Sequence, residues 1–275
     1  METPVRFAET ERVNADSYLI RQIVGEGIAP ILTPVNTLVI TAGEPIIVDT
    51  GLARTREGWL ERTFAVVDPA DVRWIYLSHD DGDHTGNVMQ VLEQCPNATL
   101  VTNWFSVERM VGDYTLPHHR MRWVNDGESF DAGDREMRAV LPPTFDSPTT
   151  RGLFDTKTGL YWAADSFAVP VPFEISTIDE LPPGVFRESF SLAQRMVSPW
   201  HRFVDPVRYG KHLDRISGLG ATVITSSHGP VLRGQEIDEA FDMLRELPDL
   251  PPVDWPTQND LHELVKKLAE MAPAS

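Results

Sequence analysis

Apolar and polar positions follow two different periods along the first half of the chain. The β-branched runs Thr37 to Thr41 and Pro45 to Val48 flank an Ala-Gly-Glu turn and predict a β-hairpin. Between about residues 54 and 67 the apolar side chains recur at helical spacing, which predicts a helix packed on the sheet. The apolar run "VRWIYLS", ending at Ser78, predicts a buried strand. With the helix, strand and helix that follow it, the pattern predicts α/β layering.

The pattern changes after residue 120. Residues 121 to 141 alternate apolar and polar side chains around Asp-Gly and Ala-Gly turns, which is typical of antiparallel strands. Two more strands, residues 160 to 165 and 221 to 227, are separated by about 55 residues of mostly helical pattern. An amphipathic helix follows in "QEIDEAFDMLREL", then a proline-rich connection and a last helix capped by Asn259 or Asp260.

Charge and cysteine content exclude several classes of function. The 275-residue chain has a formal net charge of −17 and a pI near 4.8, which opposes binding to a nucleic acid or to an anionic membrane. The N-terminus is charged where a signal peptide would be apolar, so we expect a soluble, cytoplasmic protein. The single cysteine, Cys95, excludes an internal disulfide and a cysteine-cluster zinc site, and we expect it to be a small buried side chain.

The segment "HDDGDH", residues 79 to 84, is here called the metal loop. In an extended loop, His79, Asp81 and Asp83 point to the same side, and His84 can reach a second point close by. One loop can thus supply two adjacent metals, with ligands that Fe, Mn and Zn accept. The alternative is a solvated turn with a helix cap. We favour metal binding because a buried strand delivers five ionisable groups to one end of a sheet.

The metal loop and four other blocks resemble the metallo-β-lactamase superfamily, whose signature is H-x-[H/E/D]-x-D-H after a buried strand. The other blocks are "VDTG" at 48, "DSP" at 146, "AADSF" at 163 and "SSHGP" at 226, in the order and near the spacings of the family. The resemblance implies an α/β fold, a four-layer αββα sandwich with two mixed β-sheets. It would occupy residues 1–235, with a helical insertion at about 173–218, and residues 236–275 would form a helical extension packed on the same domain.

The resemblance also implies a ligand set. His79 and Asp81 would bind the first metal, Asp165 would bridge, and the second metal would be bound by Asp83, His84 and His228. Asp83 would be both a ligand and a candidate proton acceptor. Asp49 would orient the metal loop through hydrogen bonds. Taken singly, Asp165 would be read as a helix cap and His228 as a turn residue.

Asp146 departs from the family pattern, because it stands where the family has a further histidine for the first metal. Either Asp146 is the ligand, or the first metal is weakly held and the site is mononuclear. We favour Asp146 as the ligand, although an Asx turn before Pro148 is the other reading. The pair His118 and His119 lies away from these blocks and is read as surface or packing.

Three histidines and four aspartates favour two Fe ions, with Zn or Mn as alternatives. The acidic residue at Asp81 resembles the flavodiiron and oxygen-binding di-iron branch, which binds or reduces O₂ or NO. This implies a di-iron protein that binds O₂ or NO or acts as an oxidoreductase. The flavodoxin domain of that branch is not expected here, so the resemblance favours an oxygen-binding or sensing role, or an oxidase fed by a separate protein. The alternative function is a metal-dependent hydrolase of a small ester, lactone, thioester or phosphodiester. A metal-free binding protein is the third reading, and homo-oligomerisation is left open.

The segment between Phe173 and Gly220 is predicted to form a partly apolar pocket. Its candidate lining is aromatic, and consists of Phe186, Phe190, Trp200, His201, Phe203 and Tyr209.

Overall fold

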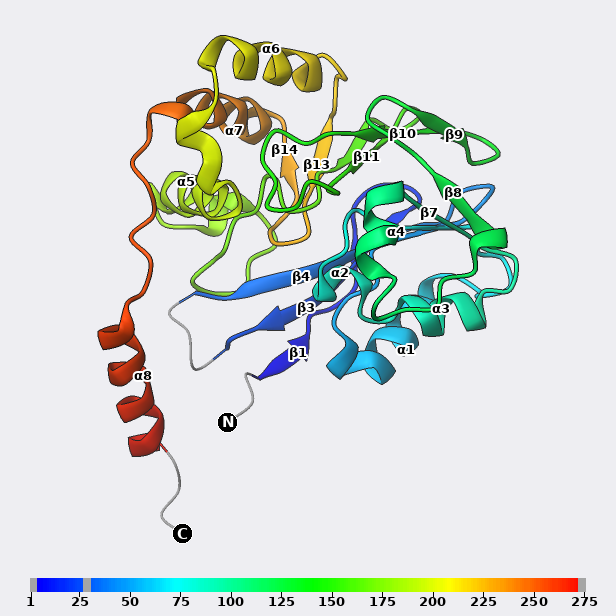
Figure 1. Ribbon diagram of the computed structural model, residues 1–275, viewed down its shortest axis with the longest axis horizontal. Coiled ribbons are helices and arrows are strands. Elements are labelled where there is room, and N and C mark those ends of the chain that lie inside the picture. Colours follow the sequence, from blue (N-terminus) through cyan, green and yellow to red (C-terminus); the bar gives the residue numbers. More distant parts are fainter. Residues whose placement is uncertain (1–3, 27–30, 272–275) are drawn as a thin grey trace.

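The computed structural model describes residues 4–26 and 31–271 and has four layers (Figure 1). Two mixed β-sheets pack face to face, and helices cover the outer face of each sheet. Three apolar clusters separate the layers: one lies between the sheets, and one lies between each sheet and its helices. The predicted αββα sandwich is therefore confirmed.

The first sheet follows the order β1-β3-β4-β5-β6-β7-β8, with β2 beside β3. Strands β3, β4 and β5 are antiparallel, so the predicted hairpin is confirmed as β4–β5, and β5 to β8 run parallel. The strands are β1 (Val5–Phe7), β2 (Glu11–Arg12), β3 (Ser17–Val24), β4 (Thr33–Ile40), β5 (Ile46–Val48), β6 (Trp74–Tyr76), β7 (Thr99–Thr102) and β8 (Met121–Trp123).

The second sheet follows the order β14-β13-β12-β11-β10-β9, in which β12 and β13 are parallel and the other pairs antiparallel. The prediction of a single antiparallel segment over residues 121 to 141 is wrong for β8, which pairs parallel with β7 in the first sheet. The strands are β9 (Ser129–Asp131), β10 (Glu136–Val140), β11 (Gly152–Asp155), β12 (Leu160–Trp162), β13 (Val223–Thr225) and β14 (Leu232–Arg233).

Helices α1 (Arg56–Val66), α3 (Val88–Gln94) and α4 (Trp104–Met110) cover the first sheet, and α5 (Val185–Val197), α6 (Pro206–Ser217) and α7 (Gln235–Glu246) cover the second. Local sequence explains where two of them begin. The Asp205 carboxylate accepts the backbone N–H groups of Val207 and Arg208 at the start of α6, and Asn103 accepts that of Ser106 at the start of α4. Short 3₁₀ turns complete the fold: η1 (Ala53–Thr55), η2 (His118–Arg120), η3 (Ile178–Glu180), η4 (Pro199–Phe203) and η5 (Leu247–Asp249).

The C-terminal extension behaves differently in its two halves. Helix α7 buries one face against α5, α6 and β14. Helix α8 (Gln258–Met271) follows the proline-rich connection, stands apart from the sandwich and is exposed from residue 258 to 267 (Figure 1). The expected packing on the domain is therefore wrong for α8. This helix also begins before the predicted caps, since Asp260 lies in its first turn and accepts hydrogen bonds from Thr257. Among the described residues, none of the helices is long and apolar enough to cross a membrane.

Candidate metal centre

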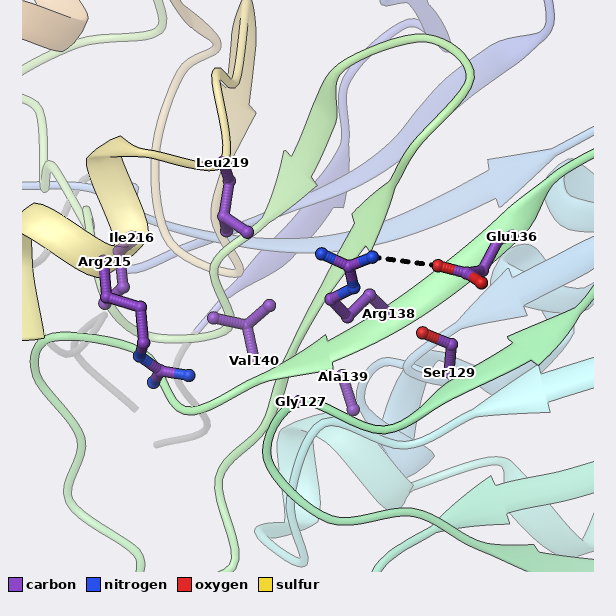
Figure 2. Close-up of a pocket in the computed structure, with 9 residues that line it drawn as sticks. All are labelled: Gly127, Ser129, Glu136, Arg138, Ala139, Val140, Arg215, Ile216 and Leu219. Carbon is purple, nitrogen blue, oxygen red and sulfur yellow. Dashed lines mark hydrogen bonds and ion pairs between the residues drawn. The ribbon is translucent and has the colours of Figure 1, made fainter.

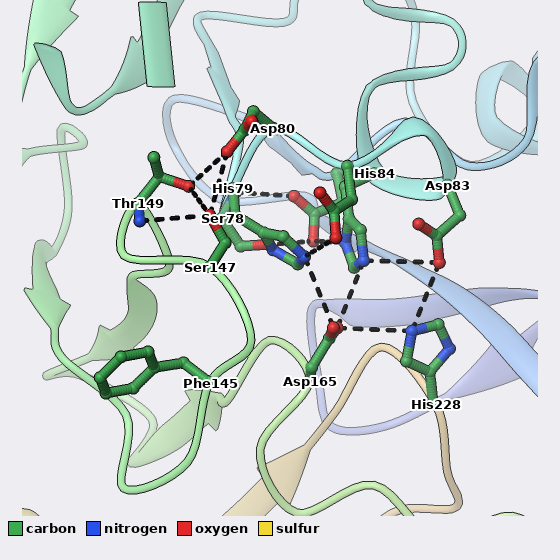
Figure 3. A network of polar contacts seen from close by, with 12 residues as sticks. Ser78, His79, Asp80, Asp83, His84, Phe145, Ser147, Thr149, Asp165 and His228 are labelled. Atoms are coloured by element: carbon green, nitrogen blue, oxygen red, sulfur yellow. Dashed lines mark hydrogen bonds and ion pairs between the residues drawn. The ribbon is translucent and has the colours of Figure 1, made fainter. Parts of the chain in front are cut away.

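The predicted ligands follow the carboxyl ends of strands from both sheets. Asp49 follows β5 and His79 follows β6 in the first sheet, whereas Asp165 and His228 follow the parallel strands β12 and β13 in the second. Because the carboxyl ends of parallel strands meet at one edge of a sheet, the two sheets present His79, Asp165 and His228 to a common point (Figure 3).

The metal loop is less extended than the sequence suggested. A short helix, α2 (Gly82–Thr85), begins inside it, with Asp81 as its extended N-cap residue. The backbone N–H groups of His84 and Thr85 both donate to the Asp81 carbonyl at 3.0 Å. Asp83 and His84 therefore lie in the first turn of α2, where they diverge from His79 and Asp81 more than an extended strand would allow.

Ligand-type atoms of the seven predicted residues come together in three overlapping groups, within each of which the atoms lie no more than 4.8 Å apart. The described residues form one group of His79, Asp81 and Asp146, a second of Asp83, His84 and His228, and a third of His79, His84 and Asp165. Asp165 lies between the first two groups, since its carboxylate is 3.4 Å from His79 Nε2 and 3.2 Å from His84 Nε2. The geometry thus brings together every residue that the resemblance implied.

Each of the three histidines is held by its outer ring nitrogen. His228 Nδ1 donates to the Pro34 carbonyl at 2.7 Å, and His84 Nδ1 donates to the Asp49 carboxylate at 3.0 Å. His79 Nδ1 lies 3.0 Å from Ser78 Oγ, whose hydroxyl hydrogen is donated to Asp49 at 2.7 Å. In the neutral rings each Nδ1 therefore carries the proton, and each Nε2 faces the centre with its lone pair, which is the tautomer that metal ligation requires.

Three buried polar atoms at this centre have no hydrogen-bond partner in the described structure: His79 Nε2, His84 Nε2 and Asp165 Oδ1. An unpaired buried polar atom costs about 1–3 kcal/mol, so three of them aimed at one point need a common explanation. A cation bound between them supplies that explanation, because it accepts electron pairs from all three atoms. The donor set of imidazole nitrogens and carboxylate oxygens fits such an ion.

The electrostatics of the centre also favour positive charge. Burial lowers the pKa of His84, but the carboxylates of Asp83, Asp165 and Asp49 raise it by more, so that its pKa lies well above the usual value. Burial raises the pKa of Asp165, but His79, His84 and His228 outweigh it and hold that pKa well below its usual range. The negative field that stabilises a proton on these rings would equally stabilise a metal cation in its place.

The two sides of the centre differ in exposure. The side chains of His79 and His84 are 0% and 1% exposed, whereas those of Asp81 and Asp83 are 43% and 28% exposed. Asp146 is exposed at the residue level, yet burial of its carboxyl and the nearby charge of Asp165 raise its pKa. The first group is therefore the more open one, and a cavity of about 500 Å³ lies beside Asp81 and α4.

Backbone strain is concentrated at this edge. The non-glycine residues with positive φ among the described residues are Asp49 (60°), Ala164 (53°) and Phe167 (60°), and all three belong to the segments that carry or support ligands. Such conformations cost about 1–3 kcal/mol each and persist where the surroundings impose them. Asp49 lies directly after β5, and Ala164 and Phe167 flank Asp165 after β12.

Two supporting residues escaped the sequence analysis. Asn36, on β4, donates to the carbonyls of Ser226 and Gly229 at 2.8 Å and so holds the turn that carries His228. Ser78 links the Asp49 carboxylate to His79 through its backbone N–H and its hydroxyl. The sequence carried a signal for each residue. Asn36 is a polar residue within an apolar strand pattern, and Ser78 directly precedes the metal loop.

The predicted aromatic pocket is only partly correct. Trp200, Phe203 and Tyr209 line a cavity of about 470 Å³ together with Phe145. Phe186 and Phe190 instead lie in the apolar cluster beneath α5, where they make edge-on ring contacts. The buried His201 is also not a lining residue, because its ring nitrogens contact the carbonyls of Ser198 and Leu250.

The remaining candidate residues lie elsewhere. His118 and His119 are exposed on η2, and Cys95 is fully buried at the end of α3. A separate cavity of about 330 Å³ lies between β10 and α6 and contains Arg138 and Arg215 (Figure 2). Its lining includes none of the predicted ligands, and both arginines pair with acidic side chains, Glu136 and Asp126.

Comparison with known proteins agrees with this geometry. A family model described as "ODP family beta lactamase" matches residues 33–229, which contain all seven predicted ligands and Asp49. The chain belongs to the ODP family. The metallo-β-lactamase resemblance that the motifs indicated is therefore confirmed.

Curated relatives of this ODP domain are larger flavoproteins. A protein named putative diflavin flavoprotein A 1, from Nostoc sp., is 25% identical over 202 residues, covering 73% of this chain and 34% of the relative. An anaerobic nitric oxide reductase flavorubredoxin from Salmonella typhi is 23% identical over 205 residues, covering 72% and 41%. The chain thus spans about a third to two fifths of these relatives.

A solved structure shows the same fold. A flavo di-iron protein from Thermotoga maritima matches with a TM-score of 0.75 at 15% identity, covering 90% of this chain and 63% of the other. The ODP domain described here therefore has the fold of a flavodiiron core.

Proposed function

We propose that this protein binds two metal ions, with iron favoured, and acts as a non-haem di-iron oxidoreductase on O₂ or NO. The observation that carries the proposal is the convergence of three histidine Nε2 atoms, each held by its Nδ1, on the buried Asp165 carboxylate. The names of the relatives, which include a nitric oxide reductase and a flavo di-iron protein, support the same class of activity.

The three groups of atoms support one assignment of ligands. His79, Asp81 and Asp146 would hold the first metal, Asp83, His84 and His228 the second, and Asp165 would bridge them. When bound, the metal pair would supply a site at which a small diatomic molecule can bind and be reduced. Asp83 is 28% exposed, so its carboxylate can contact a metal and still exchange a proton with solvent.

Iron is favoured over zinc because the set contains four carboxylates and three imidazoles. Asp81 contributes most to this preference, because it supplies a hard oxygen ligand next to His79. Zinc and manganese are the alternatives.

Reduction of O₂ or NO consumes electrons that the ligands do not provide. We therefore include a separate electron donor, in another protein or another domain, in the proposal. The open side at Asp81 and Asp146 gives a small molecule access to the centre. The net charge of −17 argues against nucleic acid and anionic membranes as partners. Assembly into a homo-oligomer would be compatible with this site, and the proposal does not depend on it.

Metal analysis of the purified chain, followed by anaerobic reduction and mixing with O₂ or NO, tests the proposal. We expect about two irons per chain, a near-ultraviolet absorption from them, and consumption of one of the two gases. His228→Ala should lose one metal, and His118→Ala, which changes an exposed histidine on η2, should retain both. Two zincs with turnover of an ester or lactone would instead establish the hydrolase alternative and end the proposal.

Asp146 has its own test, because it replaces the histidine expected in the family pattern. If it is a ligand, Asp146→Ala should weaken the first metal and leave the second in place. Asp146→His should bind the first metal again, since an imidazole is also an accepted ligand at that point. Unchanged stoichiometry and affinity in Asp146→Ala would remove this residue from the ligand set.

A further inference from the structure

Asp80, which the sequence pattern marks only as a spacer in the metal loop, joins two segments of the candidate site. Its side chain is 7% exposed and points away from the converging histidines (Figure 3). Oδ1 accepts the hydroxyls of Thr149 at 2.6 Å and Ser147 at 3.2 Å, and Oδ2 accepts Nε–H of Arg109. A spacer at the surface would need none of these contacts.

The two hydroxyls belong to the loop that carries Asp146. Residues 144–150 lie in the connection between β10 and β11 and are here called the Asp146 loop. Ser147 follows Asp146 directly, and its hydroxyl oxygen accepts the Thr149 backbone N–H at 3.3 Å. Asp80 therefore attaches this loop to the metal loop at the residue next to Asp146.

The other end of the Asp146 loop is anchored by the helical insertion. The Phe145 backbone N–H donates to Ser198 Oγ at 2.9 Å, and Trp200 Nε1–H donates to the Phe145 carbonyl at 2.9 Å. Asp146 lies between these contacts and those made by Asp80. After Asp146, the Thr149 carbonyl accepts the Asn103 side-chain N–H, and the Arg151 backbone N–H donates to the Ser78 carbonyl at 2.8 Å. The hydroxyl contacts to Asp80 are the attachment that lies nearest to Asp146 on this side.

A carboxylate suits this position because it accepts hydrogen bonds on both oxygens. Two hydroxyl donors lie on one oxygen of Asp80 and a guanidinium on the other. An asparagine could still accept both hydroxyls through its carbonyl oxygen, while the exposed Arg109 could turn to solvent. An alanine would remove every one of these contacts. Asparagine thus keeps the attachment of the Asp146 loop but removes the charge, whereas alanine removes both.

We propose that Asp80 is a positioning residue for the first metal, because it holds the Asp146 loop so that the Asp146 carboxylate meets His79 and Asp81. This inference rests on the proposed function, since it assumes that those three side chains bind a metal. It predicts that the two metal sites respond unequally to a change at Asp80.

Titration of the metal-free full chain with Fe²⁺ under anaerobic conditions tests the proposal, with the two binding steps resolved by calorimetry or chelator competition. Asp80→Ala should weaken the first-metal step by about 10- to 100-fold, the usual effect of removing a group that positions a ligand. The second step should stay within about twofold, and Asp80→Asn should restore most of the first. In an Asp146→Ala background, Asp80→Ala should add little, because the ligand that it positions is gone.

Asp155→Ala is the matched control. Asp155 is a fully buried aspartate that also accepts from an arginine, Arg135, and a threonine hydroxyl, Thr158, but it lies at the end of β11 outside the metal groups. It should lower thermal stability without changing the ratio of the two binding steps.

Equal weakening of both steps in Asp80→Ala, or a full effect in the Asp146→Ala background, would overturn the positioning role alone. A wild-type chain that binds no metal would overturn both this inference and the proposed function.

Discussion

Replacing Asp49 by Asn tests whether the outer hydrogen bonds of the histidines set the metal affinity. Asp49 is fully buried and accepts three hydrogen bonds: the backbone N–H and the hydroxyl of Ser78, and His84 Nδ1–H. Asparagine has nearly the same shape and tolerates the positive φ of this position, so the backbone need not change.

An asparagine satisfies these donors in neither orientation. With its NH₂ towards His84, two donors face each other, and His84 must move its proton to Nε2, the atom that faces the centre. With its NH₂ towards the backbone N–H of Ser78, a buried donor loses its acceptor at a cost of about 1–3 kcal/mol. We expect affinity at the second metal to fall by about 10- to 100-fold, or ~1.4 to ~2.7 kcal/mol.

Competition with a calibrated chelator, on wild type and Asp49→Asn, measures the two steps separately. A thermal melt of the metal-free proteins shows whether the variant is folded at the assay temperature. If the folded variant binds the second metal within about twofold of wild type, the outer hydrogen bond does not control the tautomer of His84, and the reasoning is wrong.

Three further predictions concern the scaffold. Gly86→Ala should lower the free energy of unfolding by at least ~2 kcal/mol in a denaturant titration, because the new Cβ would lie 2.4 Å from Ala53 N and Gly51 O. A smaller loss would mean that the backbone at residues 51–53 moves to make room for the methyl group. Burial raises the pKa of the Cys95 thiol to about 12, so a thiol reagent at pH 8 should modify the native chain at least ~100-fold more slowly than the unfolded chain, and equal rates would contradict the burial. Removal of residues 258–275 should change the Tm by less than ~2 °C, because residues 258 to 267 of α8 are exposed, and a larger drop would show that α8 packs on the domain.

Elements with a strong local period could be predicted from the sequence, and elements defined by distant partners could not. The β4–β5 hairpin depends on a short turn and was predicted, whereas β8 carries an alternating pattern but pairs parallel with β7, which only the complete sheet determines. Strand β3 was missed because it is buried on both faces and still carries Arg21 and Gln22. Arg21 donates to Asn36 within the sheet, and Gln22 donates to Thr55 in η1. Because both polar side chains are buried, the sequence of β3 lacks the usual alternation of apolar and polar residues.

The candidate ligands were easier to recognise in the sequence than most of the groups that hold them. A ligand must be a particular residue type, so "HDDGDH" carries its chemistry in its letters. The group that holds His228 is a backbone carbonyl, that of Pro34, which any residue at that position would provide. Helix α2 was missed because a single turn of helix leaves too few residues for a period.

The supports of the candidate ligands also span long distances in the chain, and they differ in part between the two proposed metal sites. The second site depends on contacts within and between the two sheets, from Asn36 to the turn at His228 and from Asp49 to His84. The proposed first site shares the Asp49 support through Ser78 and His79, and it depends in addition on a loop that side-chain hydroxyls attach to Asp80. Since loops open at lower cost than paired strands, the first metal should be the first to leave when the protein is warmed or titrated with chelator. The Asp146→Ala variant isolates the second metal, and the His228→Ala variant isolates the first. If the second metal leaves at a lower temperature or chelator concentration than the first, this order is wrong.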